Sequence, residues 1–179
     1  MGAAWCGCVC AWLAAAADAA PVDPILAVAR LSGTFRLAGR ITVATRVRGE
    51  RAGQTFLRTW RFTPRCRAGA CGTVTLVRQR SGGHDTVTLR RRSPGYYTAT
   101  GSFYVPLGCG GTTYHHGELA AFSVTVRIDG ARHDPTGAAV ATHVTATYNN
   151  SSRRNLTPCV DFPGRDAARY HGHLAVPAT

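Results

Sequence analysis

Alternation of apolar and polar residues along almost the whole chain constrains its fold more than any other feature. Phe122, Val124 and Val126 share one face of an extended segment, whereas Ser123 and Thr125 share the other. The same period of two recurs in most other segments, and it is typical of β-strands with one buried and one exposed face. No segment shows a sustained period of 3.6 residues, so the pattern predicts an all-β chain.

The pattern predicts about eight strands, separated by short turns rich in Gly, Pro, Asp and Ser. Their expected ranges are 33–48, 54–63, 72–80, 84–91, 95–105, 118–129, 138–149 and 168–176, and residues 25–30 are expected to form one helical turn. Only the connections 106–117 and 150–167 are long, and short connections favour antiparallel neighbours. We therefore expect a single-domain antiparallel up-and-down β-barrel, with a two-sheet β-sandwich as the alternative.

Residues 1–19 have the features of a secretory signal peptide. Met1 to Ala17 carry no charge, and Ala17-Asp18-Ala19 matches an A-x-A cleavage pattern. The usual basic residue near the start is missing, so either the true start lies upstream or the α-amino group supplies the charge. The apolar run is shorter than the ~20 residues that a membrane-spanning helix needs. We expect cleavage after Ala19, a β domain over 20–179, a secreted or cell-envelope location, and membrane contact only through the signal segment before cleavage.

Four cysteines remain in the expected β domain: Cys66, Cys71, Cys109 and Cys159. An even number of cysteines in an exported chain predicts two disulfides. Cys66 and Cys71 flank a short loop that contains Gly69, so their local pairing is favoured and Cys109 is left to pair with Cys159. Four thiolates on zinc are the alternative, which the wide separation of the last two cysteines disfavours.

The chain is strongly basic, with 21 Lys+Arg residues, 9 Asp+Glu residues and a net charge of +12. Such a surface attracts polyanions, although arginines dispersed over polar strand faces can also serve solubility alone. Arg90, Arg91 and Arg92 form the one basic run and are the candidate anion-binding residues, expected to project together into solvent. An anionic envelope polymer is therefore one expected partner, whereas export argues against nucleic acid.

Five aromatic residues on inward-facing positions are candidates for lining a ligand cavity: Phe56, Trp60, Phe62, Tyr97 and Phe103. The alternative is that they are packed core, because a barrel of about eight strands either fills itself with side chains or holds one small ligand. A small apolar ligand is therefore the second expected partner.

The sequence contains no recognisable catalytic motif, neither a G-x-S-x-G nucleophile turn nor a phosphate-binding glycine loop. We assign no catalytic residue, metal or cofactor. His171 and His173 lie two apart on an expected strand and share a face, and His115 and His116 lie in a Gly-rich segment. A metal-assisted extracytoplasmic enzyme that uses these four histidines is the alternative to a non-catalytic protein.

The segment WRFTPRCRAGACGTV, residues 60–74, resembles part of a group of small exported, disulfide-containing β-proteins of actinobacteria. Gly33-Thr34-Phe35 is similar to their Gly-x-aromatic opening and also resembles the Gly-x-Trp start of lipocalins, with Phe in place of Trp. The resemblance spans residues 33–162 and implies export, β-structure and disulfides, but no particular chemistry. Together these features predict an exported non-catalytic binding or structural protein of the cell envelope.

Overall fold

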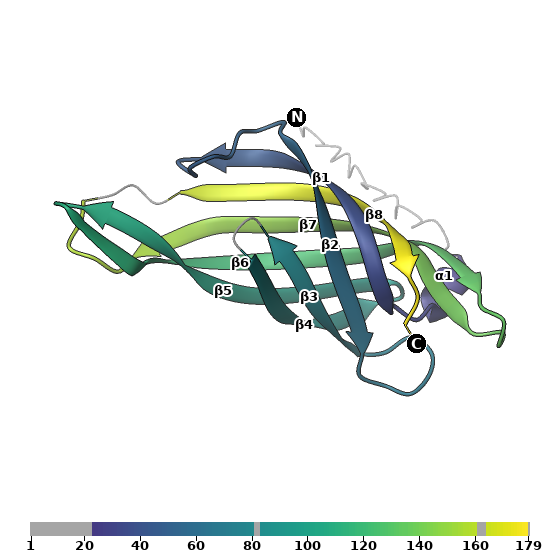
Figure 1. The fold of residues 1–179 in the computed structure, drawn as a ribbon. Helices are drawn as coiled ribbons and strands as arrows, with labels where there is room; N and C mark the ends of the chain where they lie inside the picture. Colours follow the sequence, from purple (N-terminus) through teal and green to yellow (C-terminus); the bar gives the residue numbers. More distant parts are fainter. Residues whose placement is uncertain (1–22, 81–82, 161–163, 179) are drawn as a thin grey trace, which may run out of the picture.

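The computed structural model describes residues 23–80, 83–160 and 164–178, so the expected signal segment 1–19 lies outside the described residues. The chain forms one closed antiparallel barrel whose strands follow one another in sequence order (Figure 1). The elements are α1 (Pro24–Val28), β1 (Gly33–Thr45), β2 (Thr55–Pro64), β3 (Thr73–Arg80), β4 (Gly83–Ser93), β5 (Tyr96–Cys109), β6 (Thr112–His133), β7 (Ala139–Asn155) and β8 (Arg165–Val176). Because β8 also pairs with β1, the predicted up-and-down barrel is confirmed over the sandwich.

Alternating residues of each strand point into the barrel, as the period of two predicted. In β2, Trp60 and Phe62 are buried while Arg61 between them is exposed. In β6, Val124 and Val126 are fully buried. The apolar faces of all eight strands therefore meet inside one enclosed space.

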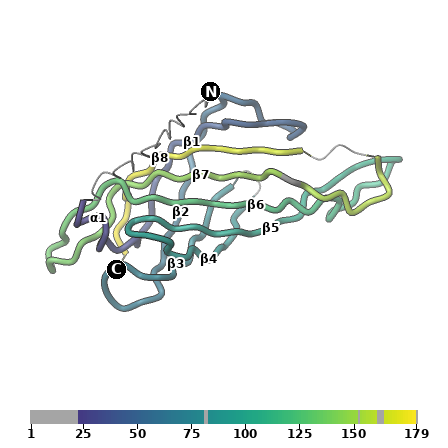
Figure 2. Tube along the Cα trace, turned by 180° about the vertical axis from the view of Figure 1, so that it is seen from behind, coloured from purple at the N-terminus to yellow at the C-terminus, as the bar shows by residue number. Residues whose placement is uncertain are grey.

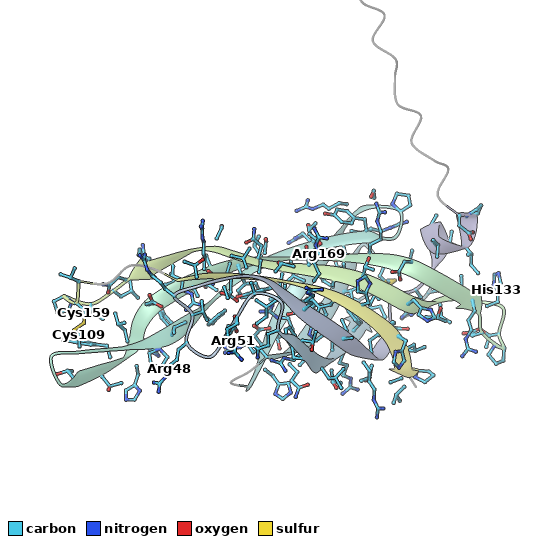
Figure 3. All side chains as sticks on the ribbon, turned by 90° about the horizontal axis from the view of Figure 1, so that it is seen from above. Arg48, Arg51, Cys109, His133, Cys159 and Arg169 are labelled. Atoms are coloured by element: carbon cyan, nitrogen blue, oxygen red, sulfur yellow. A yellow bond between two sulfur atoms is a disulfide. The ribbon has the colours of Figure 1, made fainter. Side chains whose placement is uncertain are left out.

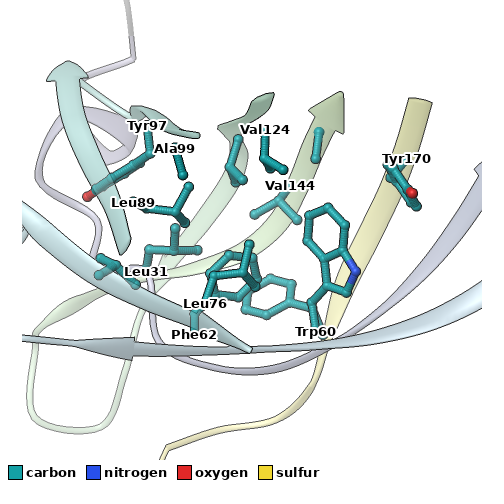
Figure 4. Packing of buried hydrophobic residues seen from close by; sticks show 14 of the residues in the cluster. Leu31, Trp60, Phe62, Leu76, Leu89, Tyr97, Ala99, Val124, Val144 and Tyr170 are labelled. Atoms are coloured by element: carbon teal, nitrogen blue, oxygen red, sulfur yellow. The ribbon is translucent and has the colours of Figure 1, made fainter. Parts of the chain in front are cut away.

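The aromatic core fills the half of the barrel nearer to α1. Trp60 packs against Phe62, with ring centroids 6.4 Å apart, and against Tyr170 at 4.8 Å. Leu76, Leu89, Val124 and Val144 belong to the same buried cluster (Figure 4). Close packing of large side chains makes this half solid rather than hollow.

The N-terminal segment closes this end of the barrel. Residue Arg30 pairs with Val140 in a parallel bridge, and Leu31 is fully buried. The Arg30 guanidinium donates to the Cys66 carbonyl at 2.7 Å, and Arg91 donates to the Ala27 carbonyl at 2.6 Å. These two arginines hold α1 and the chain that follows it across the barrel end, beside the Cys66–Cys71 disulfide.

The opposite end is extended by three long strands, β5, β6 and β7, which project beyond their neighbours (Figures 1 and 2). The predicted loop 106–117 is wrong, since β5 and β6 continue to a tight turn at Gly110 and Gly111. Pro106 lies at a register shift in the β5–β6 ladder, because it has no N–H to donate, and this break in the alternation concealed the strand. The predicted loop 150–167 shortens likewise, because β7 runs to Asn155.

Both predicted disulfides are confirmed. Cys66 is bonded to Cys71 at the α1 end, and Cys109 is bonded to Cys159 at the extended end. The second bond joins the end of β5 to the segment that connects β7 with β8 (Figure 3). It therefore ties together strands that are not neighbours in the barrel.

The barrel wall is weakest between β4 and β5. In the described part of the chain these strands pair at three positions only, Arg90↔Thr98, Arg91↔Tyr97 and Ser93↔Tyr96, all beside their connecting turn. Farther along, the strands separate around a polar hollow of about 430 Å³ whose lining includes Thr88, Thr100 and Phe122.

We expect replacement of Trp60 by Ala to lower the free energy of unfolding by about 3–5 kcal/mol, since the indole is fully buried. Leu57 on the same strand is 77% exposed, so its replacement by Ala serves as the control and is expected to change stability by less than about 0.5 kcal/mol. Urea denaturation measures both values. Equal losses for the two variants would contradict the assignment of β2 faces.

Candidate ligand-binding site

A cavity of about 340 Å³ opens at the end of the barrel opposite α1. Small-molecule pockets have volumes of about 300–1,000 Å³. Its lining is a mixture of aromatic and charged side chains: Phe56, Phe103, Tyr104, Tyr148, Tyr170, Arg48, Glu50, Arg58, Arg78, Arg80, Arg153 and Asp166. The barrel is thus solid at one end and hollow at the other.

The inner part of the cavity is bounded by two tyrosines. Tyr170 lies between Trp60 of the core and Phe56 of the cavity wall, with ring centroids 4.8 Å and 5.6 Å away. Burial raises the pKa of Tyr170 to about 12, and it also raises the pKa of Tyr148. Both phenols therefore stay uncharged at neutral pH, and they provide polar hydroxyls on otherwise apolar rings.

Phe56 reaches into the cavity because its partner across β1 and β2 is a glycine. Phe56 is paired with Gly39, and its ring occupies the space that a Cβ at position 39 would need. The Arg58 guanidinium lies over this ring, 4.5 Å from its centroid. On the neighbouring strand β3, Arg80 lies over Phe103 of β5 at the same distance. Two arginine–aromatic pairs therefore form the cavity wall.

Arg78, which lines the cavity, forms a nearly buried charge pair with Asp85 behind the wall. The Arg78 Nε and Nη2 atoms donate to the two carboxylate oxygens of Asp85 at 2.9 Å and 2.6 Å. Only 4% of the Arg78 side chain is exposed, and its guanidinium lies over the rings of Phe122 and Tyr148. This two-point contact fixes the guanidinium orientation, so the pair is a rigid part of the wall.

A second charge cluster joins β6, β7 and β8. Arg153 Nη2 donates to Asp166 Oδ1 at 3.0 Å, and Arg153 Nη1 lies 3.5 Å from Glu118 Oε2. All three side chains are nearly buried. Burial raises the pKa of Glu50 at the cavity mouth, and the negative charge of Asp166 raises it further.

The predicted ligand-lining aromatics divide between the cavity and the core. Phe56 and Phe103 line the cavity, whereas Trp60, Phe62 and Tyr97 are fully buried in the core cluster. The packed-core interpretation therefore holds for Trp60, Phe62 and Tyr97, and a ligand-lining role stays a prediction for Phe56 and Phe103.

The predicted anion-binding run does not project as a unit, which corrects the expected orientation. Arg90 and Arg92 are exposed and line the hollow between β4 and β5. Arg91 points the other way, and its guanidinium donates to the Ala27 carbonyl. Adjacent residues of a strand face opposite sides of the sheet, so three consecutive arginines cannot share one face.

The four histidines of the alternative metal site do not come together. His171 pairs with Thr145, which in turn pairs with Arg127 of β6. His116 lies eleven residues farther along β6, and this spacing corresponds to about 36 Å at ~3.3 Å per residue. Its ring stacks on Tyr104, with centroids 4.2 Å apart. Within the described ranges, no three His, Cys, Asp or Glu side chains are grouped as metal ligands.

The charged residues in and behind the cavity wall were not predicted from the sequence, although the sequence contains a signal for them. Arg58 lies on the same strand face as Phe56 and Trp60, and Asp85 on the same face as Val87 and Leu89. Each therefore occupies an inward position of the alternation. Charges at such positions are rarely buried unless they are paired, so they mark a polar interior.

Comparison of the chain with protein-family models, curated proteins and solved structures finds no match in any of the three. The resemblance to exported actinobacterial β-proteins therefore stays a prediction. Among the residues that the structure describes, no helix is long and apolar enough to cross a membrane.

Replacement of Asp85 by Asn is expected to cost about 3–5 kcal/mol of unfolding free energy, because it leaves the buried Arg78 without a carboxylate. Replacement of both residues, Arg78 by Met and Asp85 by Leu, should recover most of this loss, since the buried Arg78 charge is removed with its partner and only the part-exposed Arg80 loses a 3.5 Å contact. The exposed Asp129 changed to Asn is the control. Chemical denaturation of the four proteins measures the coupling, and a double variant less stable than Asp85→Asn would contradict this account.

Proposed function

We propose that this chain is an exported, non-catalytic binding protein of the cell envelope that holds one small ligand in the open end of its barrel. The observation that carries the proposal is the division of the interior. Large apolar side chains fill the half nearer to α1, whereas the other half contains the 340 Å³ cavity. Ligand pockets combine apolar walls with a few fixed polar groups, and this cavity has both.

Salt bridges support binding rather than catalysis. The carboxylates of Asp85, Glu118 and Asp166 each contact an arginine. A catalytic acid or base must be placed to exchange a proton with its substrate, whereas these carboxylates fix arginine side chains in the wall. The separation of His116 from His171 along the barrel also leaves the metal-assisted alternative without a supporting observation.

The two disulfides and the N-terminal sequence support export. The two disulfides are compatible with an extracellular location, because disulfides persist mainly in oxidising compartments. The apolar, uncharged character of residues 1–17 and the A-x-A pattern at 17–19 supply the second argument. A cell-envelope location would also suit the basic surface, since envelope polymers and lipid headgroups are commonly anionic.

Binding in the cavity is tested with 1-anilinonaphthalene-8-sulfonate, whose fluorescence rises in apolar surroundings. Ala168 is buried, lines the cavity and pairs with Tyr148, so Ala168→Leu is expected to fill the space and weaken binding about tenfold or more. The control is Ala175→Leu, the same change at an exposed position of the same strand. We expect the control to bind as the unchanged protein does. Equal binding by all three proteins would place the dye elsewhere and contradict the proposed function.

A further inference from the structure

Two arginines that line the cavity have an N–H group without an acceptor. The Nε atoms of Arg80 and Arg153 are buried and make no hydrogen bond. Arg80 Nε lies 3.5 Å from Asp85 Oδ2 as an ion pair, without hydrogen-bond geometry. Arg153 donates from its two terminal nitrogens to Glu118 and Asp166, and its Nε has no acceptor. A buried donor without an acceptor is costly, so these groups call for an acceptor.

Similar unpaired atoms lie elsewhere in the barrel, but they are differently placed. Trp60 Nε1 and Tyr97 Oη belong to the packed core, Arg91 Nε lies toward the closed end, and Asn150 Nδ2 and Oδ1 are buried on β7. None of these four residues lines the cavity. Arg80 and Arg153 are therefore the residues that combine an unpaired buried Nε with a place in the cavity lining.

The charge balance of the cavity also favours a negative ligand. Five arginines line it, Arg48, Arg58, Arg78, Arg80 and Arg153, against the two carboxylates Glu50 and Asp166. Asp85 and Glu118 add two further negative charges behind the wall. One positive charge remains in excess, and the raised pKa of Glu50 acts in the same direction by favouring its neutral form.

We propose that the ligand of this site is a small amphiphilic anion, whose carboxylate or phosphate group accepts from Arg80 and Arg153 while its apolar part contacts Phe56 and Phe103. The inference rests on the proposed function and specifies its ligand class. Arg80 is suited to this role because Phe103 supports its guanidinium plane from one side. A guanidinium held in this way presents its N–H edge to an oxyanion.

The test compares three ligands that share one alkyl chain: octanoate, octyl phosphate and 1-octanol. Each is titrated against the protein saturated with 1-anilinonaphthalene-8-sulfonate, and displacement of the dye gives its affinity. We expect at least one of the two anions to bind about tenfold or more tightly than the alcohol, the difference that one charge-assisted hydrogen bond provides. Octanoate and octyl phosphate together show which headgroup is preferred.

Variants locate the anion. Arg80→Met removes the charge but keeps an unbranched apolar chain against Phe103, and it should lower anion affinity about tenfold while leaving 1-octanol unchanged. Arg80→Lys keeps the positive charge and should retain part of the preference. Arg90→Met is the matched control, because Arg90 is exposed on the barrel wall outside the cavity. Circular dichroism of each variant confirms that the barrel is folded.

The possible outcomes separate this inference from the proposed function. Displacement by 1-octanol as strong as by the anions would overturn the anion preference and leave the cavity as a ligand site. Anion binding that is lost in Arg90→Met but kept in Arg80→Met would place the headgroup on the outer wall and would also overturn the inference. Failure of all three ligands to displace a dye that Ala168→Leu excludes would equally count against it.

Discussion

Because the eight-stranded sheet closes on itself, every second side chain of every strand points into one enclosed space. Eight strands leave an interior just wide enough to be filled by side chains or to hold one small ligand. One end of this barrel is filled by side chains, and the other contains the 340 Å³ cavity. Trp60, Phe62 and Leu76 fill the half next to α1, and paired charges replace apolar residues in the other half.

Charged side chains keep the open half from collapsing into more core. A buried arginine needs a carboxylate partner, and each such partner must be held at a fixed distance. Arg78 meets this need through Asp85 on the neighbouring strand, and Arg153 through Glu118 and Asp166 on the strands to either side of it. These pairs link strands across the wall and leave the space between Phe56 and Phe103 open. The Cys109–Cys159 bond holds the outer part of the same end.

Much of the fold could be predicted from the alternation of apolar and polar residues and from the spacing of the cysteines. The period of two predicted all eight strands, and the spacing of the cysteines predicted both disulfides. The strand ends beyond Val105 were missed because Pro106 interrupts the ladder there and shifts the alternation. Patterning shows which residues face inward, but it does not show how far along the barrel each one lies.

The candidate site was only half predictable for the same reason. Phe56 and Trp60 occupy equivalent inward positions of β2, yet one lines a cavity and the other is core. The difference depends on which side chains the other strands bring to the same level, such as Gly39 beside Phe56. Arg58, Arg78 and Asp85 lie at inward positions of their strands. They were not recognised as interior residues because the whole chain is basic and charged residues occur throughout it.

The open half of the barrel is proposed to receive a ligand at arginines whose Nε–H groups are unpaired. A ¹H–¹⁵N spectrum of the arginine Nε–H groups during titration with octanoate tests this binding. The Arg80 and Arg153 signals are expected to shift as they gain an acceptor, whereas the signal of Arg78, already bonded to Asp85, and that of Arg90 on the outer wall should stay in place. Shifts at Arg90 with none at Arg80 and Arg153 would contradict the account.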